Sequence, residues 1–327
     1  LGYRSIVCVL LLVGSCSTMY AQARQAPPGV FKQFDDAVRQ DAQILRGRQL
    51  FIDDDLIESM DGVTRALHQP VKYAGNPLVV QDRAWEEGGP GYTTVLYDPH
   101  EKVFSMWYGY WIEDAKPSEQ VLCYATSKDG IHWEKPVLGL HEQDGSAKNN
   151  IVWQGSGSHN FSPFLDRRPG CPDSERFKAF GGLKRDGGML LFQSPDGIHW
   201  KKSLDQAVIT KGAFDSANTG FWDPTIQKYR AYWRYFTEGI TEADNWKPAG
   251  IRAIRTAVSD DLVDWSGERD LEYTDSPDQQ MYTNNIVPYF RAPHILLGFP
   301  MRYVERGWSP SMRALPDLEK RELRSEA

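Results

Sequence analysis

The chain has 327 residues, 41% of them hydrophobic, so it can form a sizeable core as one repeat domain. Its formal net charge is −7, and Lys and Arg concentrate only in the short stretch 319–324, so nucleic acid is not expected as a partner. Aromatic residues make up 12% of the chain and include 11 Trp, which suits close packing between β-sheets.

The first residues have the features of a targeting segment. Arg4 precedes the apolar run 6–13, and Ala21-Gln22-Ala23 fits a cleavage site of small residues. This pattern predicts a secretory signal peptide over residues 1–23, whose apolar core is too short to span a bilayer as a helix. We therefore expect an exported protein, periplasmic or secreted, without a transmembrane segment. An alternative cut before Cys16 would make it a lipoprotein anchored through that residue.

Residues 24–47 are predicted to be a linker. Phe31, Phe34, Val38 and Leu45 have roughly helical spacing, so this linker is expected to contain a short docking helix. The remaining residues, 48–327, form one predicted domain.

A seven-residue phrase occurs three times in that domain. The copies are 127–133, 194–200 and 259–265, and their Trp residues lie 67 and 65 positions apart. A fixed period of this size indicates a repeated supersecondary unit. In each copy a strand is expected to end at Ser, a tight turn to form at Asp-Gly or Asp-Leu, and Trp to open the next strand.

Each repeat phrase follows three short runs rich in β-branched or aromatic residues, which are typical of strands. A further unit begins at 285–290 and 295–299, but no fourth phrase follows it. Four-stranded units arranged radially are the plan of a β-propeller, so the sequence predicts an all-β propeller that stops inside a blade. The predicted strands are 93–99, 103–108 and 121–126, then 161–166, 176–181 and 189–193, then 219–224, 228–233 and 251–257.

The phrases S-x-D-G-x-x-W and S-x-D-L-x-x-W resemble those that close blades in five-bladed propellers of glycoside hydrolase families 32 and 43, which include invertases, levanases and arabinanases. Asn76-Pro77-Leu78 is similar to the opening of such domains, and the stretch from 51–58 to Tyr303 resembles exported bacterial members. The resemblance implies a five-bladed propeller, incomplete at its C-terminus, with about three whole blades plus parts of others. Segment 51–58 would then be a strand that closes the ring.

The active-site motifs of those families match less well. No W-M-N-D-P-N-G-type motif occurs, and Trp222-Asp223-Pro224 has Trp where the R-D-P motif has Arg. Asp98, Asp166 and Asp223 occupy the same place in three units, so we interpret them as turn formers. The same reasoning applies to the repeat-phrase residues Asp129, Asp196, Asp261, His132 and His199. The sialidase box has one more residue between Asp and Trp, so a sialidase is not expected.

Function is expected where the repeats differ, in the segments before each first strand, because these segments converge on the propeller axis. Hydrolysis of a glycosidic bond needs two carboxyl groups, one protonated and one ionised. We predict Glu86 or Glu87 and Asp215 for these roles. Further residues are candidates for sugar binding: Trp85 and Tyr282 as platforms, His159, Asn160, Asn218 and Asn284 for hydroxyl groups, and Arg234 and Arg302 for an acidic sugar or the carboxylates.

Two functions remain open at this point. One is an exported glycoside hydrolase that acts on poly- or oligosaccharide, and the alternative is a propeller that binds carbohydrate without cleaving it. No cofactor is expected, because the His residues are scattered and no pair has the spacing of zinc ligands. The family resemblance leaves room for a structural calcium ion in the channel. A monomer is expected.

Overall fold

The computed structural model describes residues 7–9, 48–50, 54, 57–86, 90–112, 119–242, 245–273, 276–304, 307–316, 318–319 and 321. The predicted linker helix, Glu87 and, except for residues 7–9, the predicted signal peptide lie outside these ranges. Of the predicted closing strand 51–58, only Asp54, Ile57 and Glu58 are described, and none of the three is in a strand.

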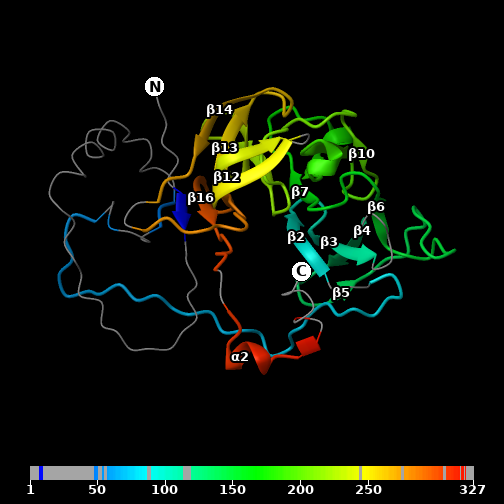
Figure 1. The fold of residues 1–327 in the computed structure, drawn as a ribbon, viewed down its shortest axis with the longest axis horizontal. Helices are drawn as coiled ribbons and strands as arrows, with labels where there is room; N and C mark the ends of the chain where they lie inside the picture. Colours follow the sequence, from blue (N-terminus) through cyan, green and yellow to red (C-terminus); the bar gives the residue numbers. More distant parts are fainter. Residues whose placement is uncertain are drawn as a thin grey trace.

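The regular secondary structure of the described residues is nearly all β-strand, arranged in consecutive sheets that are mainly antiparallel (Figure 1). The first sheet contains β2 (Pro90–Asp98), β3 (Val103–Ile112), β4 (Glu119–Ser127) and β5 (Trp133–Glu134), with β6 (Ile151–Gln154) also paired to β4. The second contains β7 (Ser162–Leu165), β8 (Phe177–Gly181), β9 (Leu190–Ser194) and β10 (Lys201–Lys202). The third contains β11 (Thr219–Asp223), β12 (Lys228–Glu242), β13 (Asn245–Ser259) and β14 (Trp265–Asp270).

A smaller fourth sheet follows. It pairs β15 (Val287–Tyr289) with β16 (Ala292–Gly298), and β1 (Val7–Val9) adds to β16 in parallel. Helical segments among the described residues include the short turns η2 (Asp173–Glu175), η3 (Lys184–Asp186) and α2 (Pro310–Arg313). None of the described helices is long and apolar enough to cross a membrane.

The repeat phrases form the predicted turns. In the second copy, the Asp196 carboxylate accepts hydrogen bonds from the backbone N–H groups of Ile198 (2.9 Å) and His199 (2.8 Å). Gly197 has a φ of 76°, in the left-handed region. Leu262 takes the corresponding position in the third copy at a φ of 69°, which strains a residue with a branched side chain. The turn therefore has the same geometry with and without glycine.

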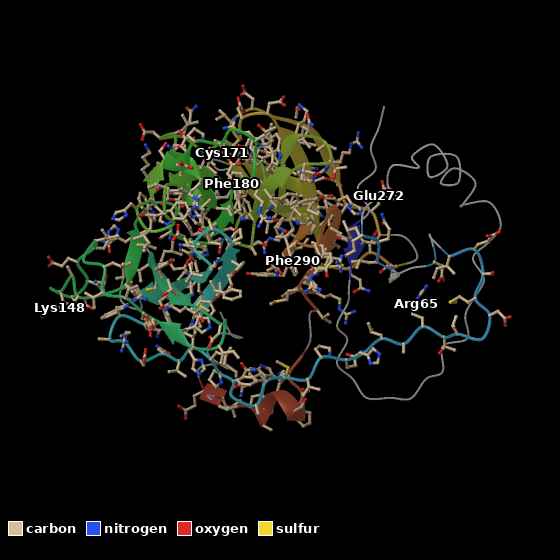
Figure 2. All side chains as sticks on the ribbon, turned by 180° about the vertical axis from the view of Figure 1, so that it is seen from behind. Arg65, Lys148, Cys171, Phe180, Glu272 and Phe290 are labelled. Carbon is tan, nitrogen blue, oxygen red and sulfur yellow. The ribbon has the colours of Figure 1, made fainter. Side chains whose placement is uncertain are left out.

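The Trp residues that follow these turns pack between neighbouring sheets. Trp200 of the second sheet meets Trp107 of β3 edge-on, with ring centroids 6.4 Å apart. Trp265 of the third sheet meets Phe180 of β8 at 5.9 Å. Phe180 lies among the densely packed side chains of this region (Figure 2). Both Trp residues thus pack against a side chain of the neighbouring sheet.

The first strands of successive sheets lie next to one another. β2 contacts β7, β7 contacts β11, and β11 contacts β15. The sheets are therefore arranged one after another with their first strands side by side. This arrangement is consistent with a propeller fold. This order decides which loops meet, because the segments that precede neighbouring first strands are brought together at one end.

Candidate functional site

The segments before β7, β11 and β15, called lead-in loops below, are joined by hydrogen bonds. The Asn160 amide donates to the carbonyl of Phe214 (2.6 Å), which links the second sheet to the third. The Ser216 hydroxyl donates to the carbonyl of Tyr282 (2.5 Å), which links the third to the fourth. The loops expected to converge are therefore in direct contact.

A histidine and a carboxylate pair at this junction. His159 Nε2 lies 3.1 Å from Asp215 Oδ1, and the two side chains are 4% and 58% exposed, respectively. The hydrogen bond from His159 lowers the pKa of Asp215 against the opposing effect of burial, and the positive charge of Arg234 acts in the same direction. Asp215 is thus an accessible carboxylate that is held in its ionised form.

Two aromatic side chains of the first sheet lie next to His159. The Trp111 ring meets His159 edge-on at 4.6 Å between centroids, and the Tyr92 ring lies 6.0 Å from it. Tyr92 has a φ of 46° next to a bulge in β2, a strained conformation for an aromatic residue. Burial, followed by the charge of Asp215, raises the pKa of Tyr92, so its hydroxyl remains protonated. Strained residues of this kind are frequent at functional sites.

Arg234 approaches from the third sheet. Its side chain leaves β12, donates from Nε to the carbonyl of Ala213 (3.0 Å), and lies over the Tyr282 ring at 4.6 Å. The guanidinium is buried. Together, Tyr92, Trp111, His159, Asn160, Asp215, Asn218, Arg234 and Tyr282 form what we call the lead-in cluster.

Four buried side chains of the lead-in cluster carry a polar atom without a hydrogen-bond partner in the described protein. Buried polar groups of folded proteins are usually hydrogen-bonded, and an unpaired one is costly. Four such atoms in one cluster leave hydrogen-bonding capacity that water or a polar ligand can satisfy. The atoms are His159 Nδ1, Asn160 Oδ1, Asn218 Oδ1 and Arg234 Nη1.

Glu86 has a different environment. Its side chain is 0% exposed and lies 2.7 Å from the ammonium group of Lys135. Its carboxylate also accepts hydrogen bonds from the Tyr108 hydroxyl (3.0 Å) and the Asp82 backbone N–H (3.0 Å). The neighbouring Trp85 donates to the Asn150 side chain (2.9 Å). These contacts tie the segment before β2 to the first sheet, and they favour a structural role for both residues.

The remaining predicted residues are also placed. Both ends of the Asn284 amide are occupied, because its nitrogen donates to Ala217 (2.8 Å) and its oxygen accepts from Thr219 (3.0 Å). Arg302 is exposed and donates to Gln279 (2.9 Å). The lead-in cluster thus contains six of the predicted site residues: His159, Asn160, Asp215, Asn218, Arg234 and Tyr282.

Sequence reasoning missed Tyr92 and Trp111. Trp111 lies near the end of the second strand β3, beyond the predicted run 103–108, and most of the predicted site residues belong to segments before first strands. Tyr92 follows the run Gly88-Gly89-Pro90-Gly91, a composition typical of an irregular backbone, and this was the available signal.

Two further features bear on the choice of site. In the part of the chain that the structure describes, no group of three or more His, Cys, Asp or Glu side chains is arranged to hold a metal ion. A cavity of about 410 Å³ on the first sheet has mainly apolar walls, including Val95, Met106 and Trp133. It lacks the convergent polar groups of the lead-in cluster, so we place the candidate site at the cluster.

No protein-family model and no curated protein matches the chain. Among solved structures, it is similar to a candidate glycosidase from Bacteroides thetaiotaomicron (17% identity, TM-score 0.42, covering 67% of this chain and 68% of that one). It is also similar to an N-acetylgalactosamine deacetylase from F. plautii in complex with blood group B trisaccharide (13%, 0.43, 66% and 63%). A third is a fructofuranosidase from Schwanniomyces occidentalis complexed with fructosylnystose (16%, 0.40, 62% and 38%). All three likenesses have TM-scores below 0.5, so the function has to be argued from the site itself.

Proposed function

We propose that the chain belongs to an exported five-bladed propeller that binds and hydrolyses oligo- or polysaccharide at the lead-in cluster. The observation that carries this proposal is the convergence of four buried, unpartnered polar atoms of the described residues around one exposed carboxylate. A sugar offers many hydroxyl groups, each of which can donate and accept, so it matches mixed donors and acceptors. The Trp111 and Tyr282 rings provide apolar surface for the sugar faces.

Asp215 is proposed as the carboxylate that stays ionised in the reaction. Its lowered pKa suits a base that activates water, or a nucleophile that attacks the anomeric carbon. His159 holds Asp215 through the 3.1 Å hydrogen bond and thereby orients it. The general acid must be a second carboxyl group. We propose Glu87 for this role, because the side chain of Glu86 is enclosed and cannot reach a sugar.

One observation supports the alternative, a propeller that binds sugar without cleaving it. Asp215 is the one carboxylate that the described residues contribute to the lead-in cluster. Hydrolysis with two carboxyl groups therefore depends on Glu87 or on another group outside the described ranges.

The test compares Asp215→Asn with the wild type on a panel of plant and microbial polysaccharides. We expect release of reducing ends to fall about 10²–10⁴-fold, with sugar binding by calorimetry largely retained. The exposed Asp205, replaced by Asn, is the matched control and should keep full activity. Full activity of Asp215→Asn would refute the catalytic assignment. Binding without turnover in the wild type would establish the non-catalytic alternative.

A further inference from the structure

Arg234 is a buried cation without a bonded carboxylate among the described residues. It is 5% exposed, and its contacts there are the Ala213 carbonyl and the face of the Tyr282 ring. Its Nη1 atom is buried and has no hydrogen-bond partner in the same part of the chain. The carboxylate of Asp215 is near enough to be influenced by its charge, but its bonded partner is His159.

A second arginine on the same strand, Arg230, has a carboxylate partner and serves as a comparison. Arg230 lies four residues earlier on β12, and its side chain lies 3.0 Å from the carboxylate of Asp223. A buried charge is strongly disfavoured unless an opposite charge or several hydrogen bonds compensate it. The guanidinium group is also the side chain best shaped to bind carboxylate, sulfate and phosphate oxygens. Among the described residues, Arg234 therefore lacks the anionic partner that Arg230 has, and an anionic ligand could take that place.

The side-chain amides of Asn160 and Asn218, which lie near Arg234, indicate which other groups a ligand would need. Asn160 and Asn218 both donate their amide nitrogen to the carbonyl of Phe214, at 2.6 and 2.9 Å. These bonds orient both side chains, so each presents its buried oxygen as an acceptor. Two fixed acceptors suit the hydroxyl groups of a sugar, and neither would bind an anionic group. The ligand must thus combine hydroxyl groups with a negative charge.

We propose that the lead-in cluster selects an acidic sugar, in which a carboxylate or sulfate group binds the Arg234 guanidinium while ring hydroxyls bind Asn160 and Asn218. This inference rests on the proposed function, because it names the substrate class of the same site. It assigns Arg234 to specificity and leaves Asp215 its part in the reaction.

The experiment uses pairs of ligands in which one member carries an anionic group and the other a neutral group at the same position. Trisaccharides of galacturonate, glucuronate and mannuronate are compared by calorimetry with their neutral methyl esters, and sulfated galactose oligosaccharides with unsulfated ones. We expect at least one acid to bind about 10–100-fold more tightly than its neutral counterpart. Preference for a carboxylated or for a sulfated member identifies which anionic group the site takes.

Three variants assign the preference to a residue. Arg234→Gln should abolish the difference between charged and neutral ligands while binding of the neutral one persists. Arg234→Lys should retain part of the difference, because it keeps the charge and loses the planar fork. Arg291→Gln removes an exposed positive charge at the β15–β16 turn and should change nothing. Circular dichroism confirms that each variant is folded.

The outcomes separate the two proposals. Equal binding of acids and neutral counterparts by the wild type would overturn the acidic-sugar inference and leave the proposed function intact. Survival of the preference in Arg234→Gln would overturn the inference in the same way. Failure of every charged and neutral oligosaccharide to bind would count against both proposals.

Discussion

The aspartates that recur in each unit act on the backbone around them. Asp98, Asp166 and Asp223 each accept a hydrogen bond from the N–H group two residues later, at 3.0 Å. Two of them also reach the next sheet, since Asp98 binds Arg176 (2.9 Å) and Asp166 accepts from the Tyr229 hydroxyl (2.7 Å). Asp223 thus makes the backbone bond expected of a turn former, and its carboxylate also pairs with Arg230 of the same sheet (3.0 Å).

The repeat-phrase carboxylates give a prediction about pH. Asp261 Oδ1 accepts from the backbone N–H groups of Val263 and Asp264, both at 2.9 Å, so Asp261→Ala should cost about 1 kcal/mol at pH 7. The Asp264 N–H, then the Val263 N–H, lower the pKa of Asp261 below its ordinary value of 3.8. The folded form therefore gains stability above that value and loses it as the pH falls through the lower folded pKa.

Urea unfolding at pH 7 and pH 3 measures this effect. The difference in unfolding free energy between wild type and Asp261→Ala should shrink at pH 3. At that pH the Asp261 carboxylate of the unfolded chain is largely protonated, so the unfolded state is favoured relative to pH 7. Asp264→Ala, which removes the next exposed carboxylate along the turn, is the control and should show a much smaller loss at pH 7. Equal losses for Asp261→Ala at both pH values would contradict the argument.

At the scale of elements, neighbouring sheets adhere through one aromatic layer. Trp107 on β3 donates to the Gly197 carbonyl of the second sheet (2.7 Å) and packs against Trp200 and Phe177. Trp200 also meets Phe161 edge-on, with centroids 5.0 Å apart. Trp133, the first repeat Trp, has part of its ring on the apolar cavity of the first sheet and is only half-buried.

The repeat Trp residues therefore allow a matched comparison. Each indole N–H of Trp133 and Trp200 donates to the carbonyl three residues earlier, so an Ala substitution removes the same hydrogen bond. Trp200→Ala should cost about 3–5 kcal/mol because it leaves a cavity between two sheets. Trp133→Ala should cost clearly less, because one side of its ring faces open space. Equal losses in urea unfolding would show that burial between sheets is not what stabilises the unit.

At the scale of the whole molecule, the sheets approach so closely that glycine is needed between them. A Cβ added to Gly220 on β11 would lie 2.3 Å from Phe180 and 3.3 Å from Phe164, both in the second sheet. The two sheets share one hydrophobic cluster that includes Phe164, Phe180, Tyr229 and Trp233. Disturbing this contact should therefore affect both sheets at once.

Gly220→Ala tests this coupling. Overpacking typically costs about 1–3 kcal/mol, and we expect the loss as a shift of a single unfolding transition. Gly307→Ala has open space around the added carbon and should be neutral. Hydrogen exchange should report faster opening in both the second and the third sheet. Faster exchange confined to β11–β14 would contradict shared packing.

Strand positions were largely predictable from the sequence. The predicted runs 103–108 and 228–233 begin where β3 and β12 begin, and 219–224 matches β11 to within one residue. β12 continues to Glu242, because its pairing with β13 past the bulge after Phe236 comes from backbone hydrogen bonds. Glu238 and Gly239 have no strand pattern, so this extension could not be read from residue types.

The candidate site was predictable only in part. Two of its polar residues, His159 and Asp215, could be named because the repeats differ before each first strand, whereas Arg234 was named from the end of a second strand. The partners of Glu86 could not be named, because Lys135 lies 49 residues further along the chain. Trp111 was missed since it belongs to a second strand that reaches the cluster only after the sheets pack.

The repeat can be recognised from neighbouring residues alone, because the spacing of its Trp phrases and the turns at their aspartates are local features of the chain. The environments of the candidate site residues depend on tertiary contacts. It enclosed one predicted carboxylate beneath Lys135, left Asp215 exposed beside His159, and buried Arg234 without a bonded anion among the described residues. Such differences arise from contacts between distant segments, and desolvation and charge pairing there depend on distance in space rather than along the chain.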